Sequence, residues 1–185
     1  MKSLFATLGA TGRLGSTVVI FLSDNGYSFG AHRWQVKRCE YEECHHVPMQ
    51  VYWPGVAART ETRLVSNVDL APTIADIADA TPLVTQDGRS LVPMITGQAV
   101  SGWRTGLLEH WPGGDDVGQW PVNDAVPAYY GIRTARYHYV ELGTGEVELY
   151  DLRTDPYELV NVASDPAYAT ARTNLRARLE ALKAG

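Results

Sequence analysis

The chain has 185 residues, 45% of them hydrophobic, and a formal net charge of -5 at pH 7. That length and apolar content can bury the core of one domain, or of one domain with an appendage. The acidic balance argues against a nucleic-acid partner, because phosphate neutralisation needs clustered Lys and Arg. The longest apolar run, near residues 17–22, is too short to span a bilayer, and no export signal is visible. We therefore expect neither nucleic acid nor a membrane as partner.

Two strands are predicted in the first third of the chain. The β-branched run over residues 17–23 ends abruptly in polar residues, which is typical of a buried parallel strand that delivers side chains into a crevice. A polar loop follows to about residue 46. The alternating segment 47–53 then predicts a second strand, which Pro54 and Gly55 stop.

A helix is predicted between residues 66 and 80. Leu70, Ile74 and Ile77 fall on one helical face, so we expect that face to point into the core. Asp69 stands near the amino end and is interpreted as a helix-start residue rather than a ligand.

The remainder of the chain predicts loops, a small sheet and a last helix. Segments 81–101 and 112–127 have the composition of surface connections. A hairpin turn is expected at 143–145, and Ser164-Asp165-Pro166 begins an amphipathic helix. The expected strands of the antiparallel sheet are 105–111, 129–134, 137–142 and 147–152.

Cys39 and Cys44 lie five residues apart, next to His45 and His46. These are zinc-ligand types, but the spacing lacks the paired Cys-x-x-Cys form, and adjacent histidines point in divergent directions. A buried pair or a Cys39 to Cys44 disulfide is the alternative.

The strand over 17–23 ends at Ser23, and Asp24, Asn25 and Gly26 follow it. Carboxylate and amide oxygens are hard ligands that suit calcium or magnesium rather than zinc or copper. The alternative for Asp24 and Asn25 is a plain turn after a strand.

An ordered series of short motifs resembles the C-terminal half of the sulfatases, which belong to the alkaline-phosphatase-like superfamily. The stretches 107–111 and 130–134 are most similar to bacterial sulfatases related to N-acetylglucosamine-6-sulfatase. The motifs are Ser23-Asp24-Asn25-Gly26, Gly30-Ala31-His32, Lys37 before Tyr41-Glu42-Glu43, Val47-Pro48, Pro54-Gly55, Val68-Asp69-Leu70-Ala71-Pro72-Thr73-Ile74, Asp87-Gly88-Arg89-Ser90-Leu91, and Glu148-Leu149-Tyr150-Asp151-Leu152 before Asp155-Pro156.

The resemblance implies a site. It assigns Asp24 and Asn25 to a divalent-metal site for calcium or magnesium, and Lys37 to a sulfate oxygen, for which an ammonium is a suitable point charge. His32 stands in the Gly-Glu-His turn of the family, here Gly-Ala-His, where substrate contact and loop packing are both open. Glu42 and Glu43 are interpreted as residues that fix the loop.

The family nucleophile is a formylglycine made from a Cys-x-Pro-Ser-Arg or Ser-x-Pro-Ser-Arg motif, and this sequence has neither. The chain therefore supplies no catalytic residue of its own, and we expect it to be inactive alone, with weak or absent metal binding. Loss of the strands that would complete the sheet also predicts self-association.

The aromatic residues of the C-terminal part have two interpretations. They could line a sugar-binding cleft or form the core and rim of the small sheet. The residues are Trp103, Trp111, Trp120, Tyr129 and Tyr130.

The fold class expected from this resemblance is α/β. Residues 1–100 would form the C-terminal part of the sulfatase α/β domain, with a partial mixed or parallel sheet. Residues 101–185 would form a small antiparallel-sheet subdomain with a C-terminal helix. The intact parent would hydrolyse a sulfate ester, for example of a sulfated sugar. The alternatives are a phosphoryl-transfer relative of the same superfamily and a non-catalytic module that binds a sulfated glycan or a protein.

Overall fold

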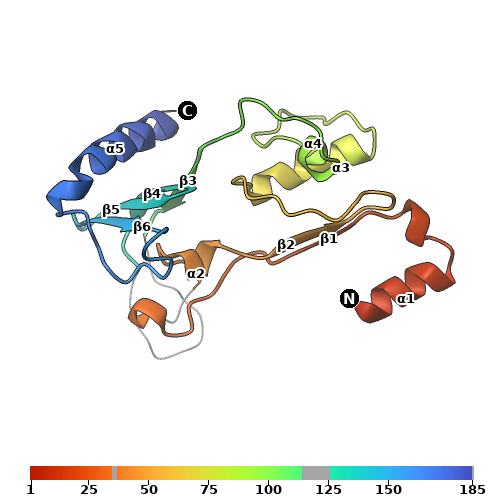
Figure 1. The fold of residues 1–185 in the computed structure, drawn as a ribbon, viewed down its shortest axis with the longest axis horizontal. Helices are drawn as coiled ribbons and strands as arrows, with labels where there is room; N and C mark the ends of the chain where they lie inside the picture. The colour runs from red at the N-terminus through yellow and green to blue at the C-terminus, as the bar shows by residue number, and fades with distance from the viewer. Residues whose placement is uncertain (35–36, 114–125, 185) are drawn as a thin grey trace. The chain divides into compact units, whose positions relative to one another are not determined.

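The computed structural model describes residues 1–34, 37–113 and 126–184 (Figure 1). The chain divides into two compact units. The first unit comprises Met1–Asp24 and Pro48–Trp103, and the second comprises Asn25–Val47 and Arg104–Gly185. The segment 25–47, which is predicted to belong with residues 1–100, thus lies in the second unit. The domain division at residue 100 itself stays a prediction. None of the described helices combines the length and the apolar character that crossing a membrane requires.

The first unit contains one two-stranded sheet and several short helices. Its strands pair antiparallel, with Val19 opposite Tyr52 and Leu22 opposite Met49. The elements are α1 (Lys2–Ala10), η1 (Leu14–Ser16), β1 (Val19–Leu22), β2 (Met49–Tyr52), η3 (Asn67–Asp69), α3 (Leu70–Ile77) and α4 (Val92–Ile95).

The expectation of a buried, parallel strand over residues 17–23 is wrong. The strand forms, but the pairing that the structure describes is antiparallel. β1 has β2 as its antiparallel partner, and the Phe21 side chain is 44% exposed. A β-branched apolar run predicts that a strand forms, but partner and direction depend on where the chain returns. Here the chain leaves the unit after Asp24 and comes back at Pro48 in the opposite direction.

On the face of α3 that the periodicity assigns to the core, Leu70 and Ile77 are half-buried, but the expectation for Ile74 is wrong. Ile74 is 55% exposed, whereas Thr73 is fully buried. The Thr73 hydroxyl donates to the carbonyl of Asp69 at 2.5 Å and accepts from the backbone N–H of Leu91 at 2.8 Å. A hydroxyl with both its bonds made can be buried at little cost, and it ties α3 to the segment before α4.

Asp69 is confirmed as a helix-start residue. Its carboxylate accepts the backbone N–H of Ser66 in a capping box and that of Arg89, each at 2.9 Å. Gly88 permits this approach, because a Cβ there would lie 2.0 Å from the carbonyl oxygen of Val68. The Asp87-Gly88-Arg89 motif therefore brings the chain against the start of α3.

The second unit is built on the predicted four-stranded antiparallel sheet, whose order is β3-β4-β5-β6. The hairpin turn between β5 and β6 lies at residues 143–145, as predicted, with Gly145 at φ 97°. The elements of the unit are η2 (Ala31–Arg33), α2 (Glu42–His45), β3 (Gly106–Trp111), β4 (Tyr129–Thr134), β5 (Tyr137–Leu142), β6 (Val147–Asp151), η4 (Pro166–Tyr168) and α5 (Ala169–Lys183).

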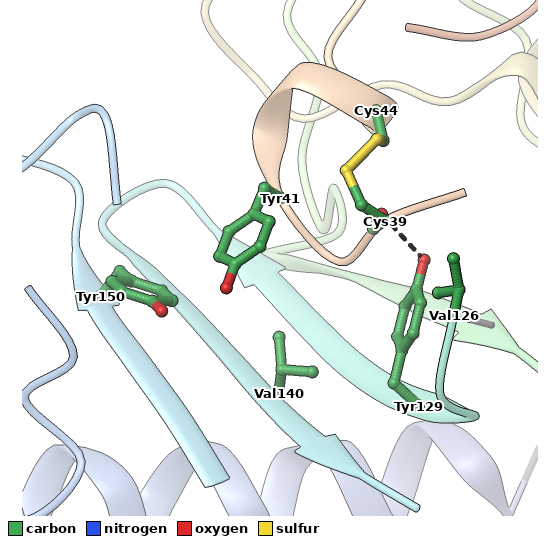
Figure 2. Packing of buried hydrophobic residues seen from close by; sticks show 7 residues of the cluster. All are labelled: Cys39, Tyr41, Cys44, Val126, Tyr129, Val140 and Tyr150. Atoms are coloured by element: carbon green, nitrogen blue, oxygen red, sulfur yellow. Dashed lines mark hydrogen bonds between the residues drawn. A yellow bond between two sulfur atoms is a disulfide. The ribbon is translucent and has the colours of Figure 1, made fainter. Parts of the chain in front are cut away.

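Both faces of this sheet are covered. One face packs against the predicted C-terminal helix α5, where Leu175 and Leu179 are buried with Ile132 of β4. The Asp165 carboxylate caps the start of this helical region by accepting the N–H of Ala167. The other face packs against the segment that contains α2, as Figure 2 shows. This second cluster contains Cys39, Tyr41, Cys44, Val126, Tyr129, Val140 and Tyr150.

Candidate functional site

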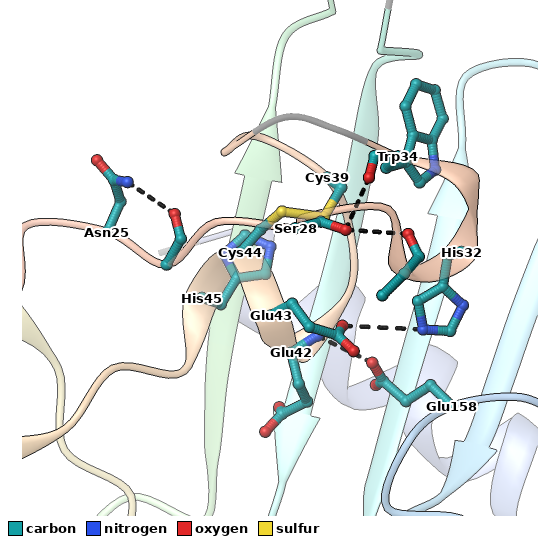
Figure 3. The surroundings of a disulfide bond; sticks show 12 residues. Asn25, Ser28, His32, Trp34, Cys39, Glu42, Glu43, Cys44, His45 and Glu158 are labelled. Atoms are coloured by element: carbon teal, nitrogen blue, oxygen red, sulfur yellow. Dashed lines mark hydrogen bonds and ion pairs between the residues drawn. A yellow bond between two sulfur atoms is a disulfide. The ribbon is translucent and has the colours of Figure 1, made fainter.

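The predicted metal ligands lie where the chain passes from the first unit to the second. Asp24 is the last residue of the first unit's opening segment, and Asn25 is the first residue of the second unit. Asp24 is exposed and Asn25 is half-buried. The Asn25 amide nitrogen donates to the carbonyl of Gly26 at 2.7 Å, so the amide of this side chain has a defined orientation (Figure 3).

Gly26 explains why this motif needs a glycine. A Cβ at this position would lie 2.0 Å from the carbonyl oxygen of Glu43. Its N–H donates to the carbonyl of Cys44 at 3.0 Å. The close backbone approach fixes Asn25 next to α2, and a larger residue would push the two segments apart.

The donor set fits part of a hard-cation site. Asp24 and Asn25 are neighbours in the chain that offer a carboxylate and an amide oxygen, the ligands that calcium and magnesium take. Calcium in proteins takes six to eight oxygens, so these two side chains alone supply a fraction of a complete shell.

His32 lies in a tight turn that begins the second unit. The Ser28 hydroxyl lies 2.9 Å from the carbonyl oxygens of both Ala31 and Trp34, and this closes the turn. The His32 imidazole stacks on the Tyr41 ring, with centroids 3.7 Å apart, and its side chain is only 10% exposed. These contacts are those of the loop-packing alternative left open by the sequence.

Lys37 is exposed and stands two residues before a disulfide. Cys39 and Cys44 are bonded to each other, with their Cα atoms 5.7 Å apart. The disulfide alternative is thereby confirmed, and the zinc alternative for these cysteines is wrong because bonded sulfurs offer no thiolate. Since both half-cystines are buried, the chain just after Lys37 is held against the sheet.

Helix α2 is anchored by polar contacts to the sheet. The Arg133 guanidinium binds both carboxylate oxygens of Glu42. The Tyr129 hydroxyl donates to the carbonyl of Cys39 at 3.2 Å and lies 3.0 Å from Nε2 of His45. Burial alone would raise the pKa of Glu42, but hydrogen bonds from His46 and Arg133 outweigh it and lower the pKa to about 2.

A buried charged triad lies on the same side of the sheet as α2. His138 is fully buried between two carboxylates, with Nδ1 at 2.6 Å from Glu158 and Nε2 at 2.8 Å from Glu109. Burial by itself lowers the pKa of His138, but the two carboxylates outweigh it and raise the pKa to about 10. At neutral pH His138 is thus an imidazolium that donates to both partners. The other Glu158 oxygen accepts the backbone N–H of Glu42 at 2.9 Å, which links the triad to α2.

This network is not evident from the local sequence pattern. The interpretation of Glu42 as a residue that fixes the loop is confirmed by its contacts with Arg133 and Glu158. Its partners could not be named from local spacing, because Glu158 lies 116 residues further along the chain. The sequence contains only a weak indication of the network. A histidine such as His138 at a buried strand position needs a charged or polar partner, but the sequence does not identify that partner.

The described aromatic residues serve mainly the core and its rim. Tyr129 is buried, and Trp111 packs against the same cluster, with the Arg38 guanidinium 4.7 Å from its ring centroid. Trp103 donates to the carbonyl of Leu64 at 2.7 Å in the first unit. Tyr130 is 37% exposed, while Trp120 lies outside the described residues.

Residues 30–185 match the family model described as N-sulphoglucosamine sulphohydrolase, C-terminal. This match covers most of the chain. The chain belongs to the sulfatase family. Its sulfatase relatives include the N-acetylglucosamine-6-O-sulfatase of Bacteroides thetaiotaomicron, which is 31% identical over 91% of this chain and 30% of the relative. The human N-acetylglucosamine-6-sulfatase is 33% identical over 88% of this chain and 34% of the relative.

Solved structures share the fold of this sulfatase chain. The structure of BT4656 in complex with its substrate D-glucosamine-2-N,6-O-disulfate matches with a TM-score of 0.86 and 30% identity, over 98% of this chain and 37% of that one. The phosphonate monoester hydrolase of Agrobacterium radiobacter matches with a TM-score of 0.82 and 30% identity, over 99% of this chain and 38% of that one. The α/β fold expected from the sequence is confirmed as the alkaline-phosphatase-like fold. The sulfatase chain spans about a third of the length of the curated relatives that it matches.

Proposed function

We propose that this chain contributes the C-terminal part of the active site of an enzyme that hydrolyses sulfate esters, with a sulfated sugar as the substrate. The observation that carries the proposal is the family match over residues 30–185, together with the Ser23 to Gly26 motif before it. Both N-acetylglucosamine-6-sulfatases named above act, by their names, on a sulfated amino sugar, which supports that substrate class.

Asp24 and Asn25 hold a divalent cation in this proposal, calcium first and magnesium second. Their oxygens are the donor type that these ions take, and Gly26 allows the segment to pack where a side chain would collide. When bound, the cation stabilises negative charge on the sulfuryl oxygens. The remaining ligands and the formylglycine nucleophile would come from outside this sequence, because the motif for the nucleophile is absent from it.

Lys37 binds a sulfate oxygen through its ammonium group. It is exposed, so its charge reaches solvent and ligand, while the nearby disulfide at Cys39 restricts the backbone that carries it. A restrained backbone reduces the entropy lost when the side chain engages the anion. For His32 the burial against Tyr41 favours support of this loop over substrate contact.

The proposed activity can be tested in a chimera. In this chimera the present chain replaces roughly the last third of the Bacteroides relative, and the rest of that enzyme is kept. The chimera should turn over N-acetylglucosamine 6-sulfate, and Asp24→Asn and Lys37→Ala should each lower this turnover by several powers of ten. The loss is large because removing one member of a group of residues that act together disables the whole group. Lys2→Ala is the matched control and should keep the activity. Equal activity in Lys37→Ala and Lys2→Ala would contradict the assignment.

The chain alone should show no enzymatic turnover of an aryl sulfate, because it contains no nucleophile motif. Calorimetry should find at most weak calcium binding. Tight, stoichiometric calcium binding by the isolated chain would contradict the incomplete ligand set. If the chain binds a sulfated sugar tightly and the folded chimera stays inactive, the alternative of a non-catalytic binding module is favoured.

A phosphoryl or phosphonyl substrate is the second candidate. The phosphonate monoester hydrolase is as similar in identity as BT4656, at 30% each. Metal-assisted displacement at phosphorus and at sulfur uses similar parts. Comparing phenyl phosphonate esters with aryl sulfates in the chimera separates the two, and a preference for the phosphonate would favour the second candidate.

A further inference from the structure

Three potential metal ligands from distant parts of the chain converge in the second unit. His32, Glu43 and Glu158 each offer one ligand atom, and these atoms lie within 4.8 Å of one another. Figure 3 shows the three side chains turned toward one another beside the disulfide. They come from the turn at η2, from α2 and from the segment after β6. This cluster is separate from Asp24 and Asn25.

Glu43 has an oxygen that the protein leaves without a hydrogen bond. Its Oε2 is buried, and no described residue donates a hydrogen bond to it. Nε2 of His32 lies 3.8 Å away, within ion-pair range but too far for a hydrogen bond. A buried carboxylate oxygen without a donor is costly, so the site favours a cation between the two side chains.

The candidate ligands are oriented by their surroundings as metal ligands usually are. Glu158 is fully buried, and its two oxygens are fixed by His138 and by the backbone N–H of Glu42, at 2.6 and 2.9 Å. The ring of His32 is fixed by stacking on Tyr41. Carboxylates that bind metal ions are themselves hydrogen-bonded by neighbouring groups, as Glu158 is here.

We propose that His32, Glu43 and Glu158 bind a zinc-class divalent cation, with water as the fourth ligand. An imidazole with two carboxylates suits zinc, whereas calcium and magnesium take oxygen ligands only. Ligand atoms on a tetrahedral zinc lie about 3.4 Å apart, so the cluster has to contract on binding. Glu43 is the ligand free to move, because its side chain is 31% exposed.

The cation would serve the structure of the loop. It would link the turn at His32, helix α2 and the segment at Glu158. The link would restrain the loop between His32 and Glu43, which carries Lys37. This role is independent of sulfate hydrolysis.

The test measures zinc binding to the full chain with its disulfide intact, by competition with a chromophoric chelator at neutral pH. One zinc should bind per chain, and His32→Asn and Glu43→Gln should each weaken binding by at least about tenfold. The matched controls are His46→Asn and Glu146→Gln, which alter an exposed histidine and an exposed carboxylate and should leave binding unchanged. These ligand variants spare the fully buried Glu158, so the fold should persist, as circular dichroism can verify.

Cobalt substitution provides a second readout. The visible absorption of a low-symmetry cobalt site should appear in the parent chain and be lost in His32→Asn. Zinc binding that is unchanged in both ligand variants, lost only in His46→Asn, or absent altogether would overturn the proposal. Asp24→Asn should not affect zinc affinity, so failure of this site and failure of the sulfatase site are distinguishable.

Discussion

The two compact units of this chain bury their residues in different ways. In the second unit a four-stranded sheet is covered on one face by α5 and on the other by the disulfide-bearing segment, and each face has a buried apolar cluster. In the first unit Leu91 and Met94 are the described apolar side chains that are buried, while Phe21 and Ile74 are largely exposed. Four strands with a packed apolar face make a core of their own, whereas a two-stranded sheet is too small to do so.

The largest effect should come from the buried triad of the second unit. Replacing His138 by Gln leaves Glu109 and Glu158 buried without a counter-charge, and breaking a buried pair costs about 3–5 kcal/mol. Urea unfolding measures this loss, and hydrogen exchange should localise it to the second unit. His46→Gln, at an exposed site, should change the free energy of unfolding by less than about 0.5 kcal/mol. Equal effects of the two variants would refute the role of the triad.

The pH dependence of the second unit follows from the same residue. The folded-state pKa of His138 is about 10, whereas an unfolded histidine has a pKa of about 6.5. Since the folded state then binds the proton more tightly, this stabilisation is fully present below about pH 6.5 and is lost as the pH rises toward 10. The free energy of unfolding should fall across that window, and His138→Gln should flatten the slope. An unchanged slope in the variant would assign the effect to other groups.

A pair of apolar truncations compares the two units directly. Leu179 is fully buried in the second unit, so Leu179→Ala should cost about 2–5 kcal/mol. Ile74 is 55% exposed in the first unit. Ile74→Ala should therefore change stability by less than about 0.5 kcal/mol. Thermal or urea unfolding measures both variants, and a large loss in Ile74→Ala would show that the first unit has a core around α3 after all.

A glycine substitution tests the approach of the Asn25 segment to α2. Gly26→Ala puts a Cβ 2.0 Å from a backbone oxygen, and overpacking of this kind costs about 1–3 kcal/mol. Gly15→Ala is the matched control, because nothing lies within 4 Å of its Cβ. Proteolysis of the folded chain should become faster within residues 25–47 in the first variant alone. If both variants behave like the parent, this segment is not held by close packing.

The smallest effect concerns association. The exposed apolar residues of the first unit and the open edges of its two-stranded sheet favour self-association. Sedimentation velocity should detect a concentration-dependent species, and Phe21→Lys should reduce it. Tyr157→Lys changes an aromatic residue of the second unit that is 70% exposed. A stronger effect of Tyr157→Lys would move the contact to the second unit, and a strict monomer at all concentrations would contradict the prediction.

Local patterns in the sequence were sufficient for much of the second unit. The strands at Tyr129–Thr134 and Tyr137–Leu142 have the bounds that alternation and turn residues predict, and the cap at Asp165 begins the helix as expected. Each of these features depends on neighbours within a few residues, whose side chains and backbone preferences are legible along the chain. The family, too, was recognisable from short motifs in their order.

Tertiary structure alone decided the features that depend on distant partners. The antiparallel pairing of β1 required knowing where the chain returns, and the burial of Thr73 in place of Ile74 required the backbone of Leu91 as its donor. The triad of Glu109, His138 and Glu158 joins three segments that share no local pattern. The sequence determined which elements form, because their periodicity is local, whereas burial and charge pairing were settled by contacts between residues far apart in the chain.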